Sequence, residues 1–309
     1  MPCRMNNRLF FVVNPAAGNG KAKKLWPEVQ SSLQSKGWLF DFVETTCKGD
    51  GIRIAREAAA KNYKCYLSIG GDGTYHEMIN GLMQAGLSTP PTTFLLPVGT
   101  GNDFVRQHKI PKWGDAWLQM LERFQTKSHN LGFLSYVGDH QKETRYFINV
   151  AGLFYDGYIV RAVTLRKKPI RSSVQYLILI LKFLFRYRPP KGRISWPGGQ
   201  MEGAYYTANI GICRYSGGGM CFVPHANPFG DGFAVTVSKK MHPIRVLLST
   251  PYFYNGKVAR HGKITCLETE RILIEPTGEE EILVEADGEY LGKAPCELIL
   301  KKKGFLLVC

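Results

Sequence analysis

Hydrophobic residues in about the first 125 positions gather in short runs separated by longer segments of helical spacing. The apolar runs predict strands at residues 9–13, 39–43, 64–69 and 93–96. The segments between them predict helices at about residues 21–36, 51–61 and 74–86, because apolar side chains recur there three to four positions apart. Strand and helix therefore alternate, which is typical of a parallel β-sheet with helices on both faces.

After about residue 130 the pattern changes to short alternating or apolar runs between turn residues. These runs predict strands at residues 146–150, 203–212, 232–237, 271–275, 281–284, 297–300 and 305–308. Such a series favours an antiparallel, mainly β domain. A basic, apolar helical insert at about residues 157–188 and a short helix near residues 243–250 interrupt it.

The change of pattern predicts two domains, in agreement with a length of 309 residues, which exceeds one typical core. We expect an α/β domain over residues 1–128. The C-terminal strand could join the sheet of this domain. A β-rich domain with the helical insert would occupy residues 129–309. The sequence contains no long linker and no internal repeat, so we expect the domains to pack tightly around a cleft.

Glycine-rich loops follow the predicted strands at residues 14–20, 70–74 and 97–103. Glycine lets backbone amides approach a ligand, and a helix N-terminus attracts anions, so Gly70-Gly71-Asp72-Gly73-Thr74 predicts a phosphate site. Asp72 fits such a site as a ligand of Mg²⁺, directly or through water. The alternative is an ordinary tight turn. In a parallel sheet all these loops lie at the carboxyl ends of strands, where ligands bind.

The common phosphate motifs are absent from these loops. A P-loop fails because Ala22, rather than serine or threonine, follows Gly20-Lys21, and Pro15 takes the place of the first glycine. A dinucleotide fingerprint fails because Lys23 and Phe104 stand where its third glycine belongs. The loops therefore belong to another nucleotide-binding scheme.

The net charge of +15 is concentrated in one region. Between residues 157 and 201 the chain has ten basic residues and no acidic one. Nucleic acid and an anionic membrane surface both fit such a region, and a solvated basic face is the alternative. The apolar segment 174–185 inside it favours a membrane, since interfacial helices pair an apolar face with a cationic one. At about twelve residues, that segment is too short to span a bilayer.

The cysteines and the N-terminus predict the compartment. Eight cysteines are scattered without a Cys-x-x-Cys pair or zinc spacing, which favours a reduced, intracellular protein. The apolar run 9–13 is too short for a secretory signal. We therefore expect a cytoplasmic protein that associates peripherally with a membrane and does not bind nucleic acid.

Five motifs occur together in this chain: Asn14-Pro15-x-x-Gly18, Gly70–Thr74 with His76-Glu77 after it, Pro97-x-Gly99-Thr100-x-Asn102-Asp103, Asp231-Gly232 and Asp287-Gly288-Glu289. In order and rough spacing the chain resembles the diacylglycerol kinase and sphingosine kinase superfamily, and within it the bacterial-type lipid kinases. Gly-Gly-Asp-Gly alone would not be specific, because NAD kinases and phosphofructokinases of similar fold carry it too.

The resemblance implies an N-terminal NAD-kinase/phosphofructokinase-like α/β domain that binds ATP, a C-terminal antiparallel β-sandwich-like domain, and phosphorylation of a lipid hydroxyl between them. It implies ATP contacts at Asn14, Pro15, Gly18, Thr45, Gly70, Gly71, Asp72, Gly73, Thr74, Tyr75, His76, Gly99, Thr100, Asn102 and Asp103. Asp72 would orient the catalytic Mg²⁺ on the phosphates. Glycine-rich loops and a Mg²⁺-binding carboxylate suit phosphoryl transfer, which needs positioning and charge neutralisation more than covalent chemistry.

For the C-terminal half the resemblance implies that Glu289 takes the proton from the lipid hydroxyl, with Asp287 nearby. A hairpin turn is the alternative interpretation of Asp287-Gly288. The resemblance also implies a structural Mg²⁺ held by Asp231 and the carbonyl groups of Pro228 and Phe233. Relatives often have a second aspartate four residues after the first, where this chain has Val235.

Two other functions are weighed against a lipid kinase. NAD kinases usually carry an Asn-Glu pair that holds the nicotinamide ribose, and no Asn-Glu dipeptide occurs in this chain. A non-catalytic nucleotide or lipid sensor is the second, against which the intact Asp72, Asp287 and Glu289 argue. The sequence does not select the lipid, and it allows a homodimer through an exposed apolar strand or through the insert.

Overall fold

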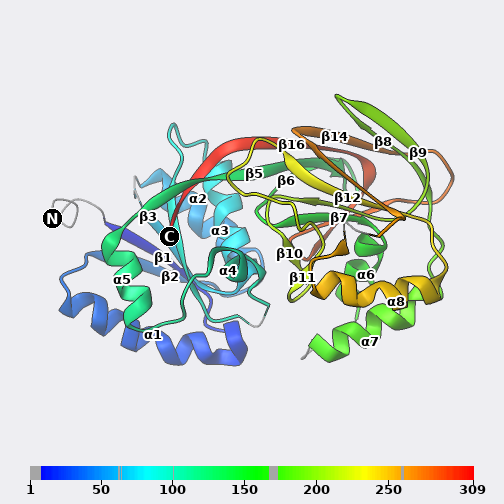
Figure 1. Ribbon diagram of the computed structural model, residues 1–309. Helices are drawn as coiled ribbons and strands as arrows, with labels where there is room; N and C mark the ends of the chain where they lie inside the picture. The colour runs from blue at the N-terminus through cyan, green and yellow to red at the C-terminus, as the bar shows by residue number, and fades with distance from the viewer. Residues whose placement is uncertain (1–7, 62, 64, 100, 167–172, 259–260) are drawn as a thin grey trace. The chain divides into compact units, whose positions relative to one another are not determined.

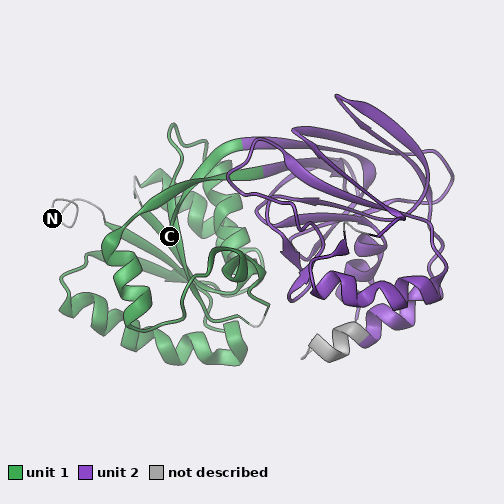
Figure 2. Ribbon diagram, in the orientation of Figure 1, with its two compact units in different colours: residues 1–131, 302–309 green, residues 132–301 purple. Residues whose placement is uncertain are grey.

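The computed structural model describes residues 8–309, apart from residues 62, 64, 100, 167–172 and 259–260 and the side chains of residues 173–177. The chain forms two compact units (Figure 1). Figure 2 shows unit 1, residues 1–131 with 302–309, and unit 2, residues 132–301. The long strands β5 (Thr126–Val137) and β16 (Glu289–Val308) contribute residues to both units.

A parallel sheet forms the centre of unit 1. Its strands are β1 (Leu9–Val13), β2 (Phe40–Glu44), β3 (Cys65–Gly70) and β4 (Thr92–Pro97). They lie in the order β4-β3-β1-β2, and residues 306–307 of β16 pair parallel with β4. All residues of β1 and β3 are buried, because helices cover both faces of the sheet.

The helices of unit 1 are α1 (Ala17–Ser35), α2 (Asp50–Ala60), α3 (Asp72–Gln84), α4 (Asp103–His108) and α5 (Asp115–Arg123). The chain steps from β1 to β2 in one direction across the sheet and from β2 through β3 to β4 in the other. Since parallel crossovers are right-handed, α1 lies on one face and α2 and α3 on the other (Figure 1). The alternation expected from the sequence is therefore what unit 1 contains.

Unit 2 is built from antiparallel strands. These are β6 (Lys142–Phe147), β7 (Val150–Phe154), β8 (Lys191–Trp196), β9 (Gly199–Gly211), β10 (Tyr215–Ser216), β11 (Met220–Cys221), β12 (Phe233–Lys239), β13 (Ile264–Thr269), β14 (Arg271–Pro276) and β15 (Leu283–Ala286). Along the main path they pair in the order β13-β12-β9-β7-β15-β16, and β8 joins β9 to β14.

Helices cover part of the unit 2 sheet. They are α6 (Tyr155–Thr164), α7 (Ser173–Leu184) and α8 (Pro243–Tyr254). Helix α6 packs on β7 and β15, while side chains of α7 and α8 meet in one apolar cluster that includes Leu184 and Val246. The predicted helical insert at about residues 157–188 thus contains two helices, α6 and α7. None of the helices in the described part of the chain combines the length and hydropathy that a membrane-spanning helix needs.

Two strand predictions are wrong in detail. The runs 297–300 and 305–308 belong to one strand, β16, because the chain passes through Lys301–Lys303 without turning. There the backbone N–H of Lys303 donates to the Asn130 side chain, which ties the polar stretch to its neighbour. The predicted strand 146–150 is divided between β6 and β7. The backbone N–H groups at this break donate to a carboxylate far along the chain, which the pattern of residues 146–150 does not indicate.

Candidate functional site

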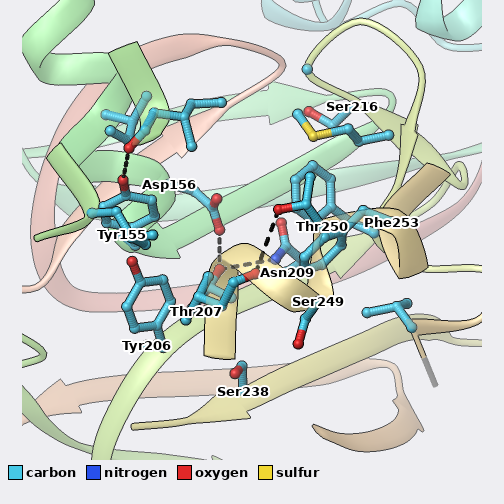
Figure 3. A pocket seen from close by; sticks show the side chains of 18 of the residues that line it. Tyr155, Asp156, Tyr206, Thr207, Asn209, Ser216, Ser238, Ser249, Thr250 and Phe253 are labelled. Atoms are coloured by element: carbon cyan, nitrogen blue, oxygen red, sulfur yellow. Dashed lines mark hydrogen bonds between the residues drawn. The ribbon is translucent and has the colours of Figure 1, made fainter. Parts of the chain in front are cut away.

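An apolar cavity lies within unit 2, beside β9 and the helices α6, α7 and α8 (Figure 3). Its apolar lining includes Ile159, Val160, Leu184, Phe222, Val246 and Phe253. Polar side chains gather at one place: the Thr207 hydroxyl donates to the Asp156 carboxylate, and Asn209 donates to Thr207 Oγ1 at 2.9 Å. An apolar interior with a few grouped polar atoms suits an amphiphilic ligand.

The turn between β15 and β16 is formed by Asp287 and Gly288, both with positive φ (50° and 82°). The Asp287 carboxylate accepts hydrogen bonds from the buried backbone N–H groups of Ile148, Asn149 and Val150, at 2.8, 2.9 and 3.2 Å. The hairpin interpretation of Asp287-Gly288 therefore describes the backbone. The side chain connects this turn to the break between β6 and β7.

Glu289 begins β16, directly after that turn. Its carboxylate forms an ion pair with Arg145 of β6, and its side chain is 12% exposed. The cation and the turn together fix the position of a largely buried carboxylate. A carboxylate held in this way is suited to accept a proton from a hydroxyl that comes within hydrogen-bonding distance.

The loop expected to hold a structural metal precedes β12. Asn227 Oδ1 accepts the backbone N–H of Phe229 at 3.1 Å, and the Gly230 N–H donates to the Asn227 carbonyl at 3.0 Å, so the loop is a compact turn. Asp231 is exposed. Val235 is fully buried in β12 and has no oxygen in its side chain, so it offers a metal no ligand.

In unit 1 the loops after β1, β3 and β4 converge. The Asn14 N–H donates to the Ile69 carbonyl at 2.9 Å, and the Val98 and Gly99 N–H groups donate to the Gly70 carbonyl at 2.7 and 3.2 Å. The Asn14 side chain also donates to Thr74 Oγ1 at 3.0 Å. Backbone and side-chain hydrogen bonds therefore join the loops that carry the first motifs, with Pro15 within the first loop.

Close approach of these loops requires glycine. A Cβ atom added at Gly99 would lie 2.6 Å from Gly71 Cα, and one at Gly18 would lie 2.4 Å from the Val98 carbonyl oxygen. A Cβ at Gly70 would lie 2.4 Å from Thr74 Oγ1. At Gly73, by contrast, a Cβ would meet no atom within 4 Å, so open space adjoins the first turn of α3. Helix N–H groups at this end have no intrahelical partner and can bind an anion.

Asp72 links two of the loops. Its Oδ2 accepts the backbone N–H of Asp103, the first residue of α4, at 2.6 Å. Asn102, which has a positive φ of 51°, donates from its side chain to the Gly99 carbonyl at 2.8 Å. Asp72 and Asp103 thus belong to neighbouring glycine-rich loops, and one or two carboxylates are what Mg²⁺ uses beside phosphates in nucleotide sites.

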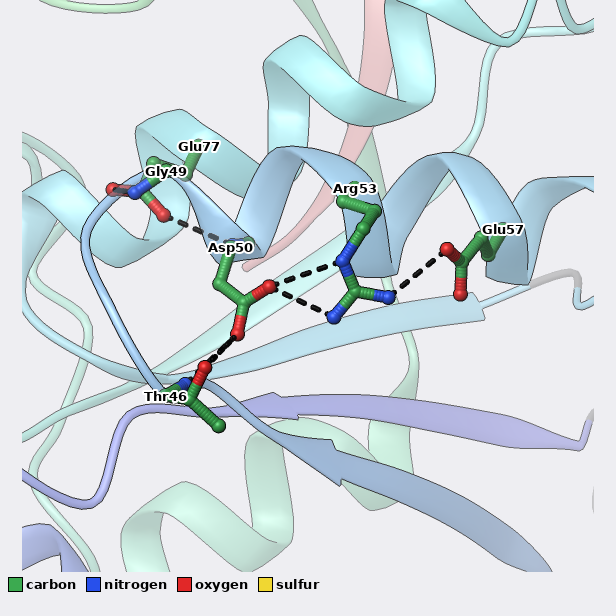
Figure 4. A network of polar contacts seen from close by, with 7 residues as sticks. Thr46, Gly49, Asp50, Arg53, Glu57 and Glu77 are labelled. Atoms are coloured by element: carbon green, nitrogen blue, oxygen red, sulfur yellow. Dashed lines mark hydrogen bonds and ion pairs between the residues drawn. The ribbon is translucent and has the colours of Figure 1, made fainter.

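Thr45 belongs to a fourth loop, after β2, and donates its N–H to the Val13 carbonyl at 2.8 Å. A polar network fixes this loop (Figure 4). The N–H and hydroxyl of Thr46 donate to Asp50 Oδ2 at 2.9 and 2.8 Å, and Arg53 binds Asp50 Oδ1. The Thr46 hydrogen bonds, followed by Arg53, lower the pKa of Asp50 to about 2. Glu77 accepts the N–H groups of Gly49 and Gly51 at 2.9 and 3.0 Å.

Two residues expected to contact ATP have side chains in the core. The Tyr75 hydroxyl lies 2.7 Å from Thr93 Oγ1, and His76 Nε2 lies 3.3 Å from the Asn80 side chain. Both residues are fully buried, so of these two only the backbone is available to a nucleotide. Thr100 lies outside the described residues.

Sequence reasoning missed several residues that shape both sites. Arg145 pairs with Glu289 across 144 positions. Glu77 was quoted in the second motif, but its capping of α2 from α3 was not foreseen. In the cavity it missed Asp156 and Glu285. Each is a polar residue within an otherwise apolar run, and a buried charge in such a run is the only local signal of a functional role.

Comparison with known proteins gives two family models that cover most of the chain. Residues 8–134 match the diacylglycerol kinase catalytic domain. Residues 150–304 match the YegS C-terminal NAD kinase beta sandwich-like domain. The chain thus has a catalytic-domain N-terminal half and a β-sandwich-like C-terminal half.

Individual relatives match over nearly the same range. A diacylglycerol kinase of Bacillus subtilis strain 168 is 26% identical over 298 residues, which is 94% of this chain and 93% of the relative. A probable lipid kinase YegS-like protein of Chromohalobacter salexigens is 28% identical over 73% of this chain and 69% of its own length. The crystal structure of a diacylglycerol kinase of Bacillus anthracis covers 98% of this chain and 96% of its own, with a TM-score of 0.69 and 21% identity.

Proposed function

Because the chain belongs to the diacylglycerol kinase catalytic-domain family and is a phosphotransferase with an alcohol group as acceptor, we propose that it uses ATP and Mg²⁺ to phosphorylate a lipid hydroxyl. The acceptor is diacylglycerol or a related lipid at a membrane surface. In this proposal unit 1 binds the nucleotide and unit 2 binds the lipid. The observation that carries it is the backbone contact of Gly71 with Gly99, directly before Asp72, which is the first residue of α3.

The converging loops of unit 1 would hold the ATP phosphates. Their proposed contacts are Asn14, Pro15, Gly18, Thr45, Gly70–Thr74, the backbone of Tyr75 and His76, Gly99, Thr100, Asn102 and Asp103. Asp72 would orient Mg²⁺ on the β- and γ-phosphates, since phosphoryl transfer relies on the metal to neutralise developing charge. Its hydrogen bond from the Asp103 N–H supports this role by fixing the carboxylate between the two loops.

Glu289 would be the general base of the reaction. The ion pair with Arg145 and the turn that precedes it support this assignment, because both limit the movement of its carboxylate. The hydrogen bonds of Asp287 to backbone amides fit a positioning role for that residue, beside Glu289 rather than in proton transfer. A carboxylate at hydrogen-bonding distance typically accelerates such a step by about 10² to 10⁴-fold.

A structural Mg²⁺ would be held by Asp231 and the carbonyl groups of Pro228 and Phe233. The compact turn at Asn227 supports this proposal, since it gathers the residues around the loop. Buried Val235 removes one potential ligand, so we expect weaker metal affinity than with two carboxylates. Titration with Mg²⁺ of the full chain and of Asp231→Asn tests this site separately from catalysis.

The apolar cavity of unit 2 would receive the lipid, and α7 and α8 would contact the membrane. Ile178 on α7 and Leu248 on α8 are 60% and 71% exposed, and Lys182 and Arg186 lie on or next to α7. Exposed apolar side chains beside cations are typical of helices that bind an anionic interface. We propose a peripheral membrane protein of the cytoplasm, and these side chains support its contact with the membrane.

A homodimer is a further proposal. Strand β2 ends the sheet order in unit 1, and Phe42 and Val43 are about 40% exposed (41% and 40%). Edge strands with exposed apolar residues pair readily with a second chain. Sedimentation velocity of the full chain and of Phe42→Lys would show whether this edge joins two copies.

The first experiment is transfer of labelled γ-phosphate from Mg·ATP to lipids in mixed micelles, with NAD as a parallel acceptor. A labelled lipid that is lost with Asp72→Ala and with Glu289→Gln supports the kinase. Label in NADP would replace the proposal with an NAD kinase. Tight ATP binding without transfer to any acceptor would replace it with a nucleotide or lipid sensor.

A further inference from the structure

Two buried carboxyl groups approach each other at the polar side of the unit 2 cavity. Asp156 is in the first turn of α6, and Glu285, 4% exposed, is in β15. Gly152 of β7 pairs with Glu285 in the sheet. A Cβ at Gly152 would lie 2.4 Å from Glu285 Oε1 and 2.8 Å from Asp156 Cβ, so only glycine leaves room for both side chains.

Neutral donors surround both carboxyl groups. The Thr207 hydroxyl donates to Asp156, and the Gly288 N–H donates to Glu285 Oε2 at 2.9 Å. Among the described residues that line the cavity there is no lysine or arginine. The described lining does include His261, whose Nε2 lies 3.2 Å from the Ser249 hydroxyl. Any negative charge on the pair is therefore not neutralised by a lysine or arginine of the cavity wall.

Burial decides how much charge the pair carries. Burial raises the pKa of Asp156 to about 6. Burial and the nearby Asp156 raise the pKa of Glu285 well above its ordinary value. Two neighbouring carboxyl groups in an apolar site do not both ionise, so near neutral pH the pair holds about one proton and one negative charge.

We propose that Asp156 and Glu285 select the headgroup of the acceptor lipid: they admit headgroups with free hydroxyl or ammonium groups and exclude headgroups that carry phosphate. This inference rests on the proposed function, because it assigns the cavity to the acceptor. An ionised carboxylate accepts hydrogen bonds from hydroxyl and ammonium groups. A phosphate at the same place would meet a like charge in an apolar surrounding, where repulsion is least screened.

Equilibrium binding of single-chain lipids to the full-length protein, without ATP, tests the inference. The probes are a monoacylglycerol, a single-chain amino alcohol and a lysophosphatidylglycerol of equal chain length, below their micelle concentrations. We expect the wild type to bind the first two at least about tenfold more tightly than the phosphate-bearing lipid. In Asp156→Asn/Glu285→Gln we expect this ratio to fall close to one, while exposed Glu280→Gln keeps it.

Several outcomes would overturn the inference. These are a wild-type ratio near one, an unchanged ratio in the folded double variant, and no lipid binding by the wild type. Circular dichroism checks folding, and if the double variant does not fold, the single variant Asp156→Asn must lower the ratio. Since binding is read without ATP, phosphorylation of lipids regardless of headgroup would refute the inference and leave the proposed function intact.

Discussion

The two candidate sites are built from different parts of the chain. In unit 1 the loops touch through main-chain atoms, as at Gly71 and Gly99, and the hydrogen bonds that join them come largely from the backbone. In unit 2 the cavity and the turn at Asp287 depend on side chains from many strands and helices. The substrates proposed for the two units would account for the difference, because every nucleotide presents the same phosphates, whereas a lipid is recognised by the shape and charge of a pocket.

The largest expected effect is on stability, when Asp287 of unit 2 is replaced. Replacing Asp287 with alanine leaves the buried N–H groups of Ile148, Asn149 and Val150 without their acceptor. We expect the free energy of unfolding to fall by about 3 to 5 kcal/mol, since each such group costs about 1 to 3 kcal/mol. Chemical denaturation measures it. Asp287→Asn keeps one acceptor oxygen and should lose less; equal stability of all three proteins would show that the turn does not depend on this side chain.

In the backbone-built site of unit 1, a substitution should act by displacing the loops rather than by removing a hydrogen bond. Gly99→Ala would place a Cβ 2.6 Å from Gly71 Cα and separate the two loops. We expect ATP affinity to fall by about 10²-fold, because small misplacements in such sites have effects of that size. Isothermal titration with ATP analogues measures it. Gly262→Ala, where the added Cβ meets nothing within 4 Å, is the control, and equal affinities for both variants would contradict the close contact.

The proposed membrane binding sharpens the contrast, since the exposed large apolar side chains that lie on helices, among the described residues, belong to α7 and α8 of unit 2. Replacing Ile178 and Leu248 with serine should weaken binding to anionic vesicles by about tenfold or more, as expected when apolar side chains no longer insert. Vesicle sedimentation measures it. Leu39→Ser removes a residue of unit 1 that is 69% exposed and should have no effect. Equal losses in both variants would mean that apolar exposure alone, and not this surface, drives binding.

The smallest expected effect is on the pH dependence of stability, which should have opposite signs in the two units. The pKa of Asp50 is lowered to about 2 by Thr46 and Arg53, so its stabilisation is present above its unfolded pKa near 3.8 and is lost as the pH falls toward 2. The pKa of Asp156 is raised to about 6 by burial, so its unit gains stability as the pH falls from about 6 to 4. Amide hydrogen exchange resolves each unit. Asp50→Asn should remove the first trend. Asp156→Asn/Glu285→Gln should remove the second, because burial raises the pKa of Glu285 as well. Trends of the same sign in the two units would contradict these environments.

The backbone site was also the easier one to predict. The residues Gly70–Thr74 are contiguous, so their glycines and carboxylate predict a phosphate-binding loop without any knowledge of the fold. The parallel sheet followed from the same local pattern. Arg145 and Glu289, by contrast, are separated by 144 positions, and only the pairing of distant strands brings them together.

The candidate site of unit 2 was predicted only in outline, for a physical reason. Whether a buried Asp156 or Glu285 is functional depends on what surrounds it, and those neighbours come from several separate strands and helices. Likewise, the side chains of Tyr75 and His76 lie in the core although their positions fall within the phosphate motif. A motif specifies the backbone path; the direction of each side chain is decided by the packing of α3 on the sheet.

The return of β16 to the first sheet has a consequence for how the chain matures. Residues 306–307 pair with β4, whose own residues are translated more than two hundred positions earlier. On the ribosome the sheet of unit 1 therefore keeps an open flank until the whole of unit 2 has emerged. Nascent chains with unpaired strand edges are prone to aggregate. Shortening the protein at residue 301 would leave that flank of the sheet permanently unpaired. A change far in sequence from the glycine-rich loops would therefore affect unit 1, the unit that contains them, first.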